Sequence, residues 1–127
     1  MTPPDQEEII KNYISAYNSF DLDGMFANLH SEIEFINFDK GEVNLTIIGI
    51  DAFKVQAKQA ALIFKSRHQK ITTIVYKGNL VEVDIHYTGI LAKGLPNGLK
   101  EGDEIELSGK SVFEFHDGLI IKLVDRS

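Results

Sequence analysis

Two long stretches in the second half of the chain alternate between apolar and polar side chains. In residues 80–92 the side chains of Val81, Val83 and Ile85 fall on one face, and residues 104–115 repeat this pattern. Alternation with a period of two predicts β-strands that have one buried face and one solvated face. Strands of this length twist strongly, so they constrain the chain to a curled sheet with other elements packed on its concave face.

The first half of the chain supplies helices for that face. Apolar residues recur at three- and four-residue steps over residues 3–20, which predicts a helix with one buried side. Asp21 is placed to cap a short second helix over residues 22–29. A third helix is predicted over residues 51–64, directly after Gly49, and its small alanine residues would let it lie close to a sheet.

Four further strands are predicted, at residues 32–38, 43–47, 71–76 and 119–124, and residues 93–103 form a loop. The resulting order of helices and strands indicates an α+β fold, in which three helices from the N-terminal half pack on a curled, largely antiparallel sheet. A length of 127 residues fits a single domain, residues 1–127. We expect a pocket between the helices and the concave face.

Charge and composition exclude several classes of partner. The chain has 19 acidic residues against 13 Lys and Arg, a net charge of −6, whereas nucleic acids and anionic membranes select basic surfaces. Cysteine is absent, which excludes disulfides and thiolate chemistry. We identify no signal peptide at the N-terminus and no apolar run long enough for a membrane span, so we expect a cytoplasmic protein.

Several local features accompany this order of elements. They are Tyr13 in the first helix, the segment 18–24 that ends Asp-Leu-Asp-Gly, Gly49 before the third helix, and Phe-Glu-Phe at residues 113–115. Together they resemble the nuclear transport factor 2-like superfamily, which includes ketosteroid isomerases and SnoaL-like polyketide cyclases. The resemblance covers nearly the whole chain and implies a cystatin-like cone that forms a homodimer through the outer face of its sheet.

The resemblance also implies positions for catalytic residues. Ketosteroid isomerases have a Tyr, an Asp that acts as the general base, and a second, neutral acid. The corresponding positions here are Tyr13, Asn37 and Ser111. An amide cannot accept a proton and a hydroxyl is a weaker donor than a carboxylic acid, so steroid isomerisation by that mechanism is not expected. Asp39 lies two residues beyond Asn37 on the same strand face, and an insertion or a bulge would bring it into the position of the base.

The predicted pocket is mostly aromatic. Its lining is expected to consist of Tyr13, Tyr17, Phe35, Asn37, Phe53, Tyr87, Ser111, Phe113 and Phe115. Each polar member also has a purely structural interpretation. The tyrosines would pack in the core with their hydroxyls at its edge, Asn37 would tie down the adjacent turn, and Ser111 would make room for a helix.

No metal or cofactor is expected. Glu82, Asp84 and His86 share a strand face, but neighbours at this spacing lie about 6.5–7 Å apart and do not converge on one ion. The solvated face of the sheet, or a dimer interface, explains them better. Similarly, His68 is expected to lie in water beside Arg67.

Three functions remain open at this point. The first is a protein that binds a small apolar or aromatic molecule without a dedicated catalyst. The second is an isomerase or polyketide-cyclase type of enzyme, in which Asp39 is the general base and Tyr13 stabilises the enolate. The third and weaker hypothesis is a protein-association module that uses Leu95 and Leu99 in the long loop.

Overall fold

The computed structural model describes every residue from Met1 to Ser127. In chain order the elements are α1 (Pro3–Asn18), α2 (Leu22–Phe26), β1 (Leu29–Asp39), β2 (Glu42–Ile48), α3 (Ile50–Ala61), β3 (Phe64–Lys77), β4 (Leu80–Leu91), β5 (Glu104–His116) and β6 (Leu119–Arg126). The strands form one sheet in the order β2-β1-β6-β5-β4-β3, and β1 with β6 is its parallel pair. This arrangement confirms the predicted α+β class and its largely antiparallel sheet.

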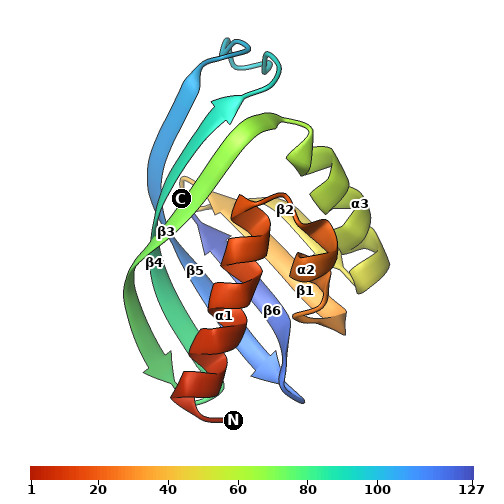
Figure 1. Cartoon of the computed structure of the whole chain (residues 1–127), viewed down its shortest axis with the longest axis vertical. Coiled ribbons are helices and arrows are strands. Elements are labelled where there is room, and N and C mark those ends of the chain that lie inside the picture. Colours follow the sequence, from red (N-terminus) through yellow and green to blue (C-terminus); the bar gives the residue numbers. More distant parts are fainter.

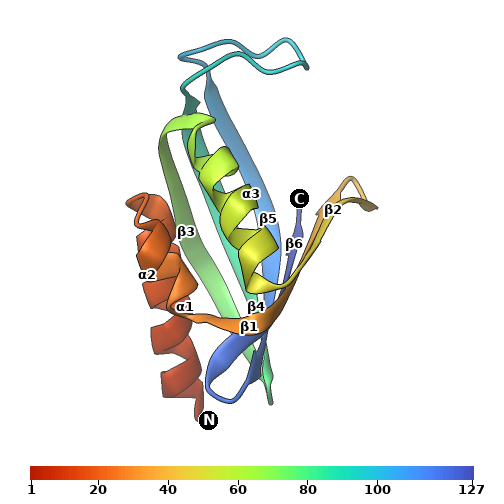
Figure 2. The same cartoon turned by 90° about the vertical axis from the view of Figure 1, so that its right-hand side faces the viewer.

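All three helices lie on the concave side of the curled sheet (Figure 1). α1 packs beside β3, whereas α3 packs beside β1 and β2, so the two helices cover opposite edges of the same concave face. Seen from the side, the loop between β4 and β5 extends beyond the helices at one end (Figure 2). The interior is therefore enclosed by helices on one side and by strands on the other.

Local chemistry fixes the start and the position of α1. The Thr2 hydroxyl accepts from the backbone N–H of Asp5, and the Asp5 carboxylate accepts from the Thr2 N–H, which together form a capping box. Ile10 is fully buried on the inner side of the helix. Gln6 is 2% exposed and its amide donates to the Gly78 carbonyl oxygen at 2.7 Å, which ties α1 to the hairpin between β3 and β4.

The strand β3 is longer than predicted. It begins at Phe64, which had been placed in the third helix, and not at the start of the predicted strand 71–76. Its pairing with β4 shifts between Phe64 and Ser66 and again between Ile71 and Thr73. Each irregularity interrupts the alternation of side chains, so the first half of the strand carries no simple period of two.

Two other boundaries also differ from the prediction. The helix α2 ends at Phe26, and β1 already begins at Leu29. Leu29 continues the helical spacing from Met25, but its backbone is paired with Ile120 in β6. At the other end of the chain, β6 continues to Arg126, two residues past its predicted end.

The core lies between the helices and the inner face of the sheet. Its most deeply buried apolar side chains include Ile10, Ile33, Val81, Val83, Phe113, Ile120 and Leu123. In β4 the buried positions alternate with partly exposed ones, as the sequence pattern predicts. Burial of these large side chains supplies most of the free energy that stabilises the fold.

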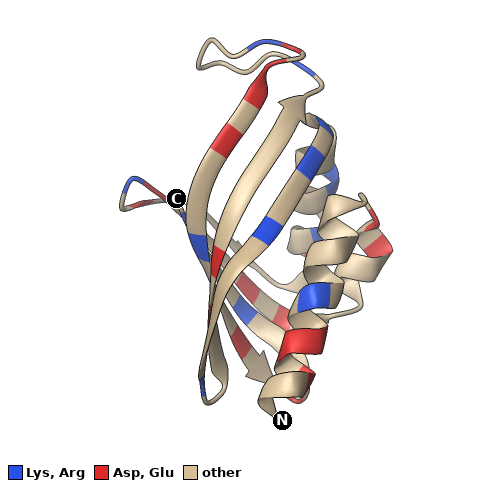
Figure 3. Cartoon of the chain, turned by 60° about the vertical axis from the view of Figure 1, so that its left-hand side comes forward, with Lys and Arg blue, Asp and Glu red and all other residues tan.

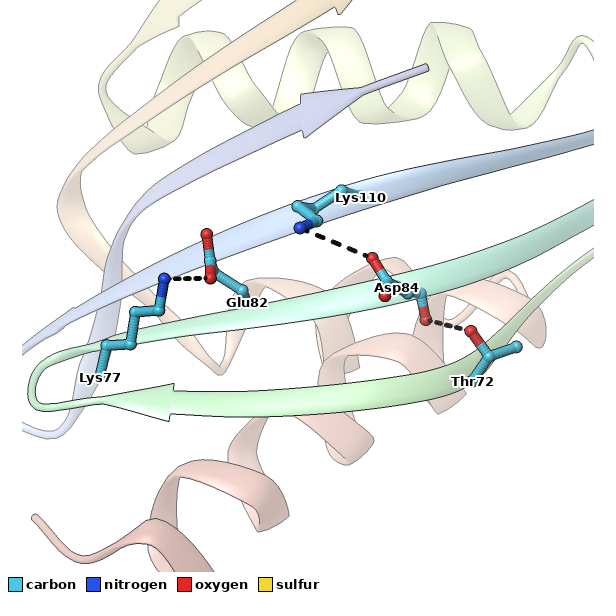
Figure 4. A network of polar contacts seen from close by, with 5 residues as sticks. All are labelled: Thr72, Lys77, Glu82, Asp84 and Lys110. Carbon is cyan, nitrogen blue, oxygen red and sulfur yellow. Dashed lines mark hydrogen bonds and ion pairs between the residues drawn. The ribbon is translucent and has the colours of Figure 1, made fainter.

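The outer face of the sheet is polar and paired (Figure 4). Lys77 approaches Glu82 at 2.7 Å, Lys110 approaches Asp84 at 3.9 Å, and the Thr72 hydroxyl donates to the Asp84 carbonyl oxygen. Separate cations thus accompany the two acids that had been considered as metal ligands. No group of three or more His, Asp or Glu side chains is arranged to hold a metal ion. The homodimer expected at this face stays a prediction.

Acidic and basic residues are interspersed along the strands and helices (Figure 3). None of the helices has both the length and the hydropathy that crossing a bilayer requires.

Replacing Gly109 in β5 by alanine is expected to destabilise the protein. A Cβ at this position would lie 2.5 Å from the backbone oxygen of Arg126, so β6 would have to move away. We expect the free energy of unfolding in urea to fall by about 1–3 kcal/mol. Gly94→Ala is the matched control, because its Cβ would meet nothing closer than 3.5 Å. Equal stabilities of the two variants would contradict the close packing of β5 against β6.

Candidate functional site

A cavity of about 410 Å³ lies between the helices and the concave face of the sheet. Of its 26 lining residues, 16 are hydrophobic. This volume falls within the range of roughly 300–1,000 Å³ that is typical of small-molecule sites, and such sites are usually apolar with a few polar groups. The polar groups that line the cavity therefore decide what chemistry it offers.

Eight of the nine predicted pocket residues line this cavity. They are Tyr13, Tyr17, Phe35, Asn37, Phe53, Tyr87, Ser111 and Phe113. Phe115 does not line the cavity, because the register of β5 shifts before it and the side chain is buried in the core near the β5–β6 hairpin. The binding of a ligand by the other eight residues stays a prediction.

Asp39 does not lie where the enzyme hypothesis placed it. It is the last residue of β1, it is exposed, and the cavity lining contributed by β1 ends at Asn37. The β1–β2 register shifts after Asn37, and the chain turns at Lys40 with a φ of 52°. Asp39 is thus carried past the edge of the concave face, and its carboxylate lies outside the cavity.

A different carboxyl group occupies the cavity. Asp125 on β6 is paired in register with Asn37 on β1 and with Ser111 on β5, and all three residues line the cavity. The Ser111 hydroxyl donates to Asp125 Oδ1 at 2.7 Å. The two positions that hold acids in ketosteroid isomerases hold an amide and an alcohol here, and the strand between them supplies a carboxyl group.

Burial controls the acidity of this group. Removal from water raises the pKa of Asp125 from its ordinary value of 3.8 to about 6, and the hydrogen bond from Ser111 opposes part of this rise. A carboxyl group with this pKa is available both as a base and as an acid close to neutral pH. Asp125 therefore has the properties of a proton-transfer group.

The sequence pattern could have predicted that Asp125 faces the cavity, but the last strand was predicted to end too early. Asp125 follows buried Leu123 by two residues, so an extended strand places both side chains on the inner face. The predicted strand ended one residue before Asp125. A strand extended to Arg126 would have brought this carboxyl group to the apolar face.

The phenols of the cavity are neutral donors. The Tyr13 ring packs edge-on against Phe113, with ring centres 6.1 Å apart, and burial together with the charge of Asp125 raises the pKa of Tyr13. Its hydroxyl has no protein partner. Every fully enclosed side-chain oxygen or nitrogen in the chain has a partner, so the unpartnered Tyr13 hydroxyl is not fully enclosed and is open to the cavity. The Tyr17 and Tyr87 hydroxyls instead bond to each other at 2.8 Å.

Asn37 ties down the hairpin and also lines the cavity. Its amide nitrogen donates to the side-chain oxygen of Asn44 at 2.7 Å, which ties β1 to β2 across the hairpin. The residue nevertheless lines the cavity beside Asp125. The hydrogen bond to Asn44 therefore accounts for the amide nitrogen of Asn37, as the structural interpretation predicts. The residue also lies in the cavity lining, as expected.

Arg67 is the cavity residue that the sequence least suggested. It was not among the predicted pocket residues, but it is 5% exposed and lines the cavity from β3, next to exposed His68. Its guanidinium lies 3.7 Å from the centre of the Tyr17 ring, and Nε donates to the Tyr17 carbonyl oxygen at 2.8 Å. A cation is thus buried in the wall of the cavity.

The family model of the SnoaL-like domain matches residues 10–123 of this sequence. The chain belongs to the SnoaL-like domain family. The match spans the helices and nearly all of the sheet, and it ends two residues before Asp125. Among proteins with curated descriptions, none matches this SnoaL-like domain.

Several solved structures share the fold of this chain. A candidate polyketide cyclase from Xanthomonas campestris is 22% identical, with 98% of this chain and 90% of that chain covered and a TM-score of 0.75. A cystatin-fold protein from Novosphingobium aromaticivorans is also 22% identical, with coverages of 93% and 94% and a TM-score of 0.75.

A protein with a ketosteroid isomerase-like fold from Catenulispora acidiphila, in complex with trimethylamine, is 16% identical. The coverages are 98% and 85%, and the TM-score is 0.76. At these identities the three structures establish the fold, and they confirm the predicted cystatin-like arrangement.

Proposed function

We propose that this SnoaL-like domain binds a small, largely apolar carbonyl compound and transfers a proton at the carbon beside the carbonyl group. The observation that carries the proposal is the carboxyl group of Asp125, which lines the apolar cavity, accepts from Ser111 and has its pKa raised to about 6. Proton transfer at such a carbon needs a base with a pKa near the working pH and a donor for the developing oxyanion.

The residues divide these tasks as follows. Ionised Asp125 takes the proton, the electron pair of the C–H bond forms the enolate double bond, and the carbonyl electrons move to oxygen. The Tyr13 hydroxyl, which has no protein partner, donates to that oxygen. Protonated Asp125 then returns the proton to the same carbon or to a conjugated one, which regenerates both the carbonyl and the carboxylate.

The similar structures support this class of chemistry. Besides the Xanthomonas protein, they include IdmH from Streptomyces antibioticus, described as a candidate polyketide cyclase, and TerC co-crystallised with polyporic acid. Proteins of the same fold thus carry a cyclase description or were crystallised with an organic acid. In this chain the base of the isomerase or cyclase hypothesis is Asp125 in place of Asp39.

Exchange of the acidic C–H protons of a bicyclic aryl ketone tests the proposal directly. With 1-tetralone in D₂O, we expect the protein to accelerate deuterium incorporation beside the carbonyl, followed by proton NMR. The catalysed rate should rise with pH and level off, with a midpoint near the Asp125 pKa of about 6, because the ionised carboxylate is the base.

The same measurement separates the enzyme from a binding protein. Tetralone that broadens the resonances of cavity residues without exchanging its protons would reject proton transfer and leave the hypothesis of a pure binding protein. A catalysed rate that lacks a titration between pH 5 and 7 would reject Asp125 as the base.

A further inference from the structure

Arg67 has aromatic neighbours but no acidic one. Its guanidinium carbon lies 3.7 Å from the centre of the Tyr17 ring and 4.5 Å from the centre of the Phe20 ring. None of the chain's ion pairs includes Arg67, although the chain has 19 acidic residues. A buried charge without a counter-ion is costly, and the aromatic faces offset only part of this cost.

The hydrogen-bonding capacity of Arg67 is also incompletely used. Nε donates to the Tyr17 carbonyl oxygen at the end of α1, and Nη2 lies 4.0 Å from the Met25 sulfur. A guanidinium carries five N–H donors in a fixed fork, and Nη1 has no protein partner. Every fully enclosed side-chain nitrogen in the chain has a hydrogen-bond partner, so Nη1, which has none, is not fully enclosed. Because Arg67 lines the cavity, its free N–H groups are open to the cavity.

Arg67 lines the cavity from β3, where it is paired with Gly89, whereas Asp125 lines it from β6. They form no ion pair, and the phenols of Tyr13 and Tyr17 are close enough to both for each charge to influence their acidity. A ligand that fills the cavity can therefore meet both the N–H donors of Arg67 and the carboxyl group of Asp125. The orientation of the ligand is set by the group that accepts hydrogen bonds from the Arg67 guanidinium.

We propose that the ligand carries an anionic oxygen group, such as a carboxylate or an acidic enol, which the free N–H donors of Arg67 bind inside the cavity. This inference rests on the proposed function, because it names the substrate class of the same cavity as an organic acid with an apolar body. Arginine binds such groups through parallel, charge-assisted hydrogen bonds. The apolar body of the ligand then occupies the cavity that Asp125 also lines.

Two fluorescent probes that differ by one anionic group test the inference. The anion 8-anilinonaphthalene-1-sulfonate and neutral N-phenyl-1-naphthylamine share their aromatic skeleton, so the ratio of their Kd values isolates the contribution of the charge. At pH 8, Arg67→Met is expected to weaken binding of the sulfonate relative to the neutral probe by about ten-fold or more. Arg67→Lys, which keeps the charge but loses the fork, should change the ratio less, by about three-fold.

Location and folding need their own controls. Ala60→Phe projects a ring into the cavity from α3 and should abolish binding of both probes. If Arg67→Met does not fold, as judged by circular dichroism, the Arg67→Lys ratio decides the question. An unchanged ratio in the folded variants, or sulfonate binding that survives Ala60→Phe, overturns the inference. Failure of the wild type to bind either probe overturns the proposed function as well. Absence of tetralone exchange alone contradicts only the proposed function, because the ratio of the two Kd values can still be measured.

Discussion

Asp125→Asn is expected to abolish proton transfer while making the folded protein more stable. The asparagine oxygen can still accept from the Ser111 hydroxyl, so the geometry of the cavity is kept. An amide cannot take the proton, and loss of a positioned general base lowers rates by about 100- to 10,000-fold. The rate of deuterium incorporation into 1-tetralone at pH 7 measures this loss.

The gain in stability has a defined dependence on pH. Burial raises the folded-state pKa of Asp125 to about 6, above the ordinary value of 3.8 that applies in the unfolded chain. Near pH 2 the carboxyl group is protonated in both states, so its ionisation costs the wild type nothing. As the pH rises through 3.8 towards 6 the unfolded chain ionises first and the wild type is progressively destabilised, by up to about 3 kcal/mol above pH 6, at 1.36 kcal/mol per pKa unit.

Urea unfolding of both proteins at two pH values checks this sign. The asparagine variant should exceed the wild type most at pH 8, and the difference should shrink to about half at pH 5. Asp84→Asn is the matched control, since Asp84 lies on the outer face and its side chain is 48% exposed. Asp39→Asn discriminates the earlier hypothesis, because an exposed carboxylate outside the cavity should leave exchange unchanged. An asparagine variant that loses stability at pH 8 would refute the buried, ionised carboxylate.

Phe113→Ala is expected to cost about 3–5 kcal/mol of unfolding free energy. Phe113 is 1% exposed, and its backbone is paired with Val81 on one side and Leu123 on the other, so its side chain sits in the middle of the inner face. Truncation removes the edge-on contact with Tyr13 and leaves a space next to the existing cavity. This loss is a large fraction of the stability of an ordinary domain.

Denaturant unfolding measures this effect, and Leu62→Ala serves as the control. Leu62 is also a large apolar residue but is 69% exposed, so its truncation should change stability by less than about 0.5 kcal/mol. Comparable losses in the two variants would show that Phe113 does not pack as described.

The sequence predicted the fold well because its strongest patterns are long. Alternation in β4 and β5 predicted which side chains point inward, and the buried residues of both strands are among these positions. Helical spacing in α1 placed Tyr13 and Tyr17 on the inner side, where they line the cavity. Patterns that extend over many residues survive an error of two residues at either end.

The site was harder to predict because it depends on strand ends and irregularities. Asp39 was assigned to the face of Asn37 by simple alternation, but the strand ends there and the hairpin register shifts. Asp125 was missed because the last strand was predicted to be too short. Arg67 was not among the predicted pocket residues, because charged residues normally are exposed and only the tertiary structure supplies the aromatic rings that bury it.

The parallel pairing of β1 with β6 has a consequence for how the protein folds. Asn37 and Asp125 are neighbours across this pair although 88 residues separate them in the chain (125 minus 37). Contacts between such distant segments form slowly, since the chain loses the entropy of closing a long loop before these contacts can stabilise it. An intermediate that has completed only the β3–β4–β5 meander would leave Asp125 hydrated and as acidic as in a short peptide. Acquisition of catalytic competence should therefore coincide with the last step of folding.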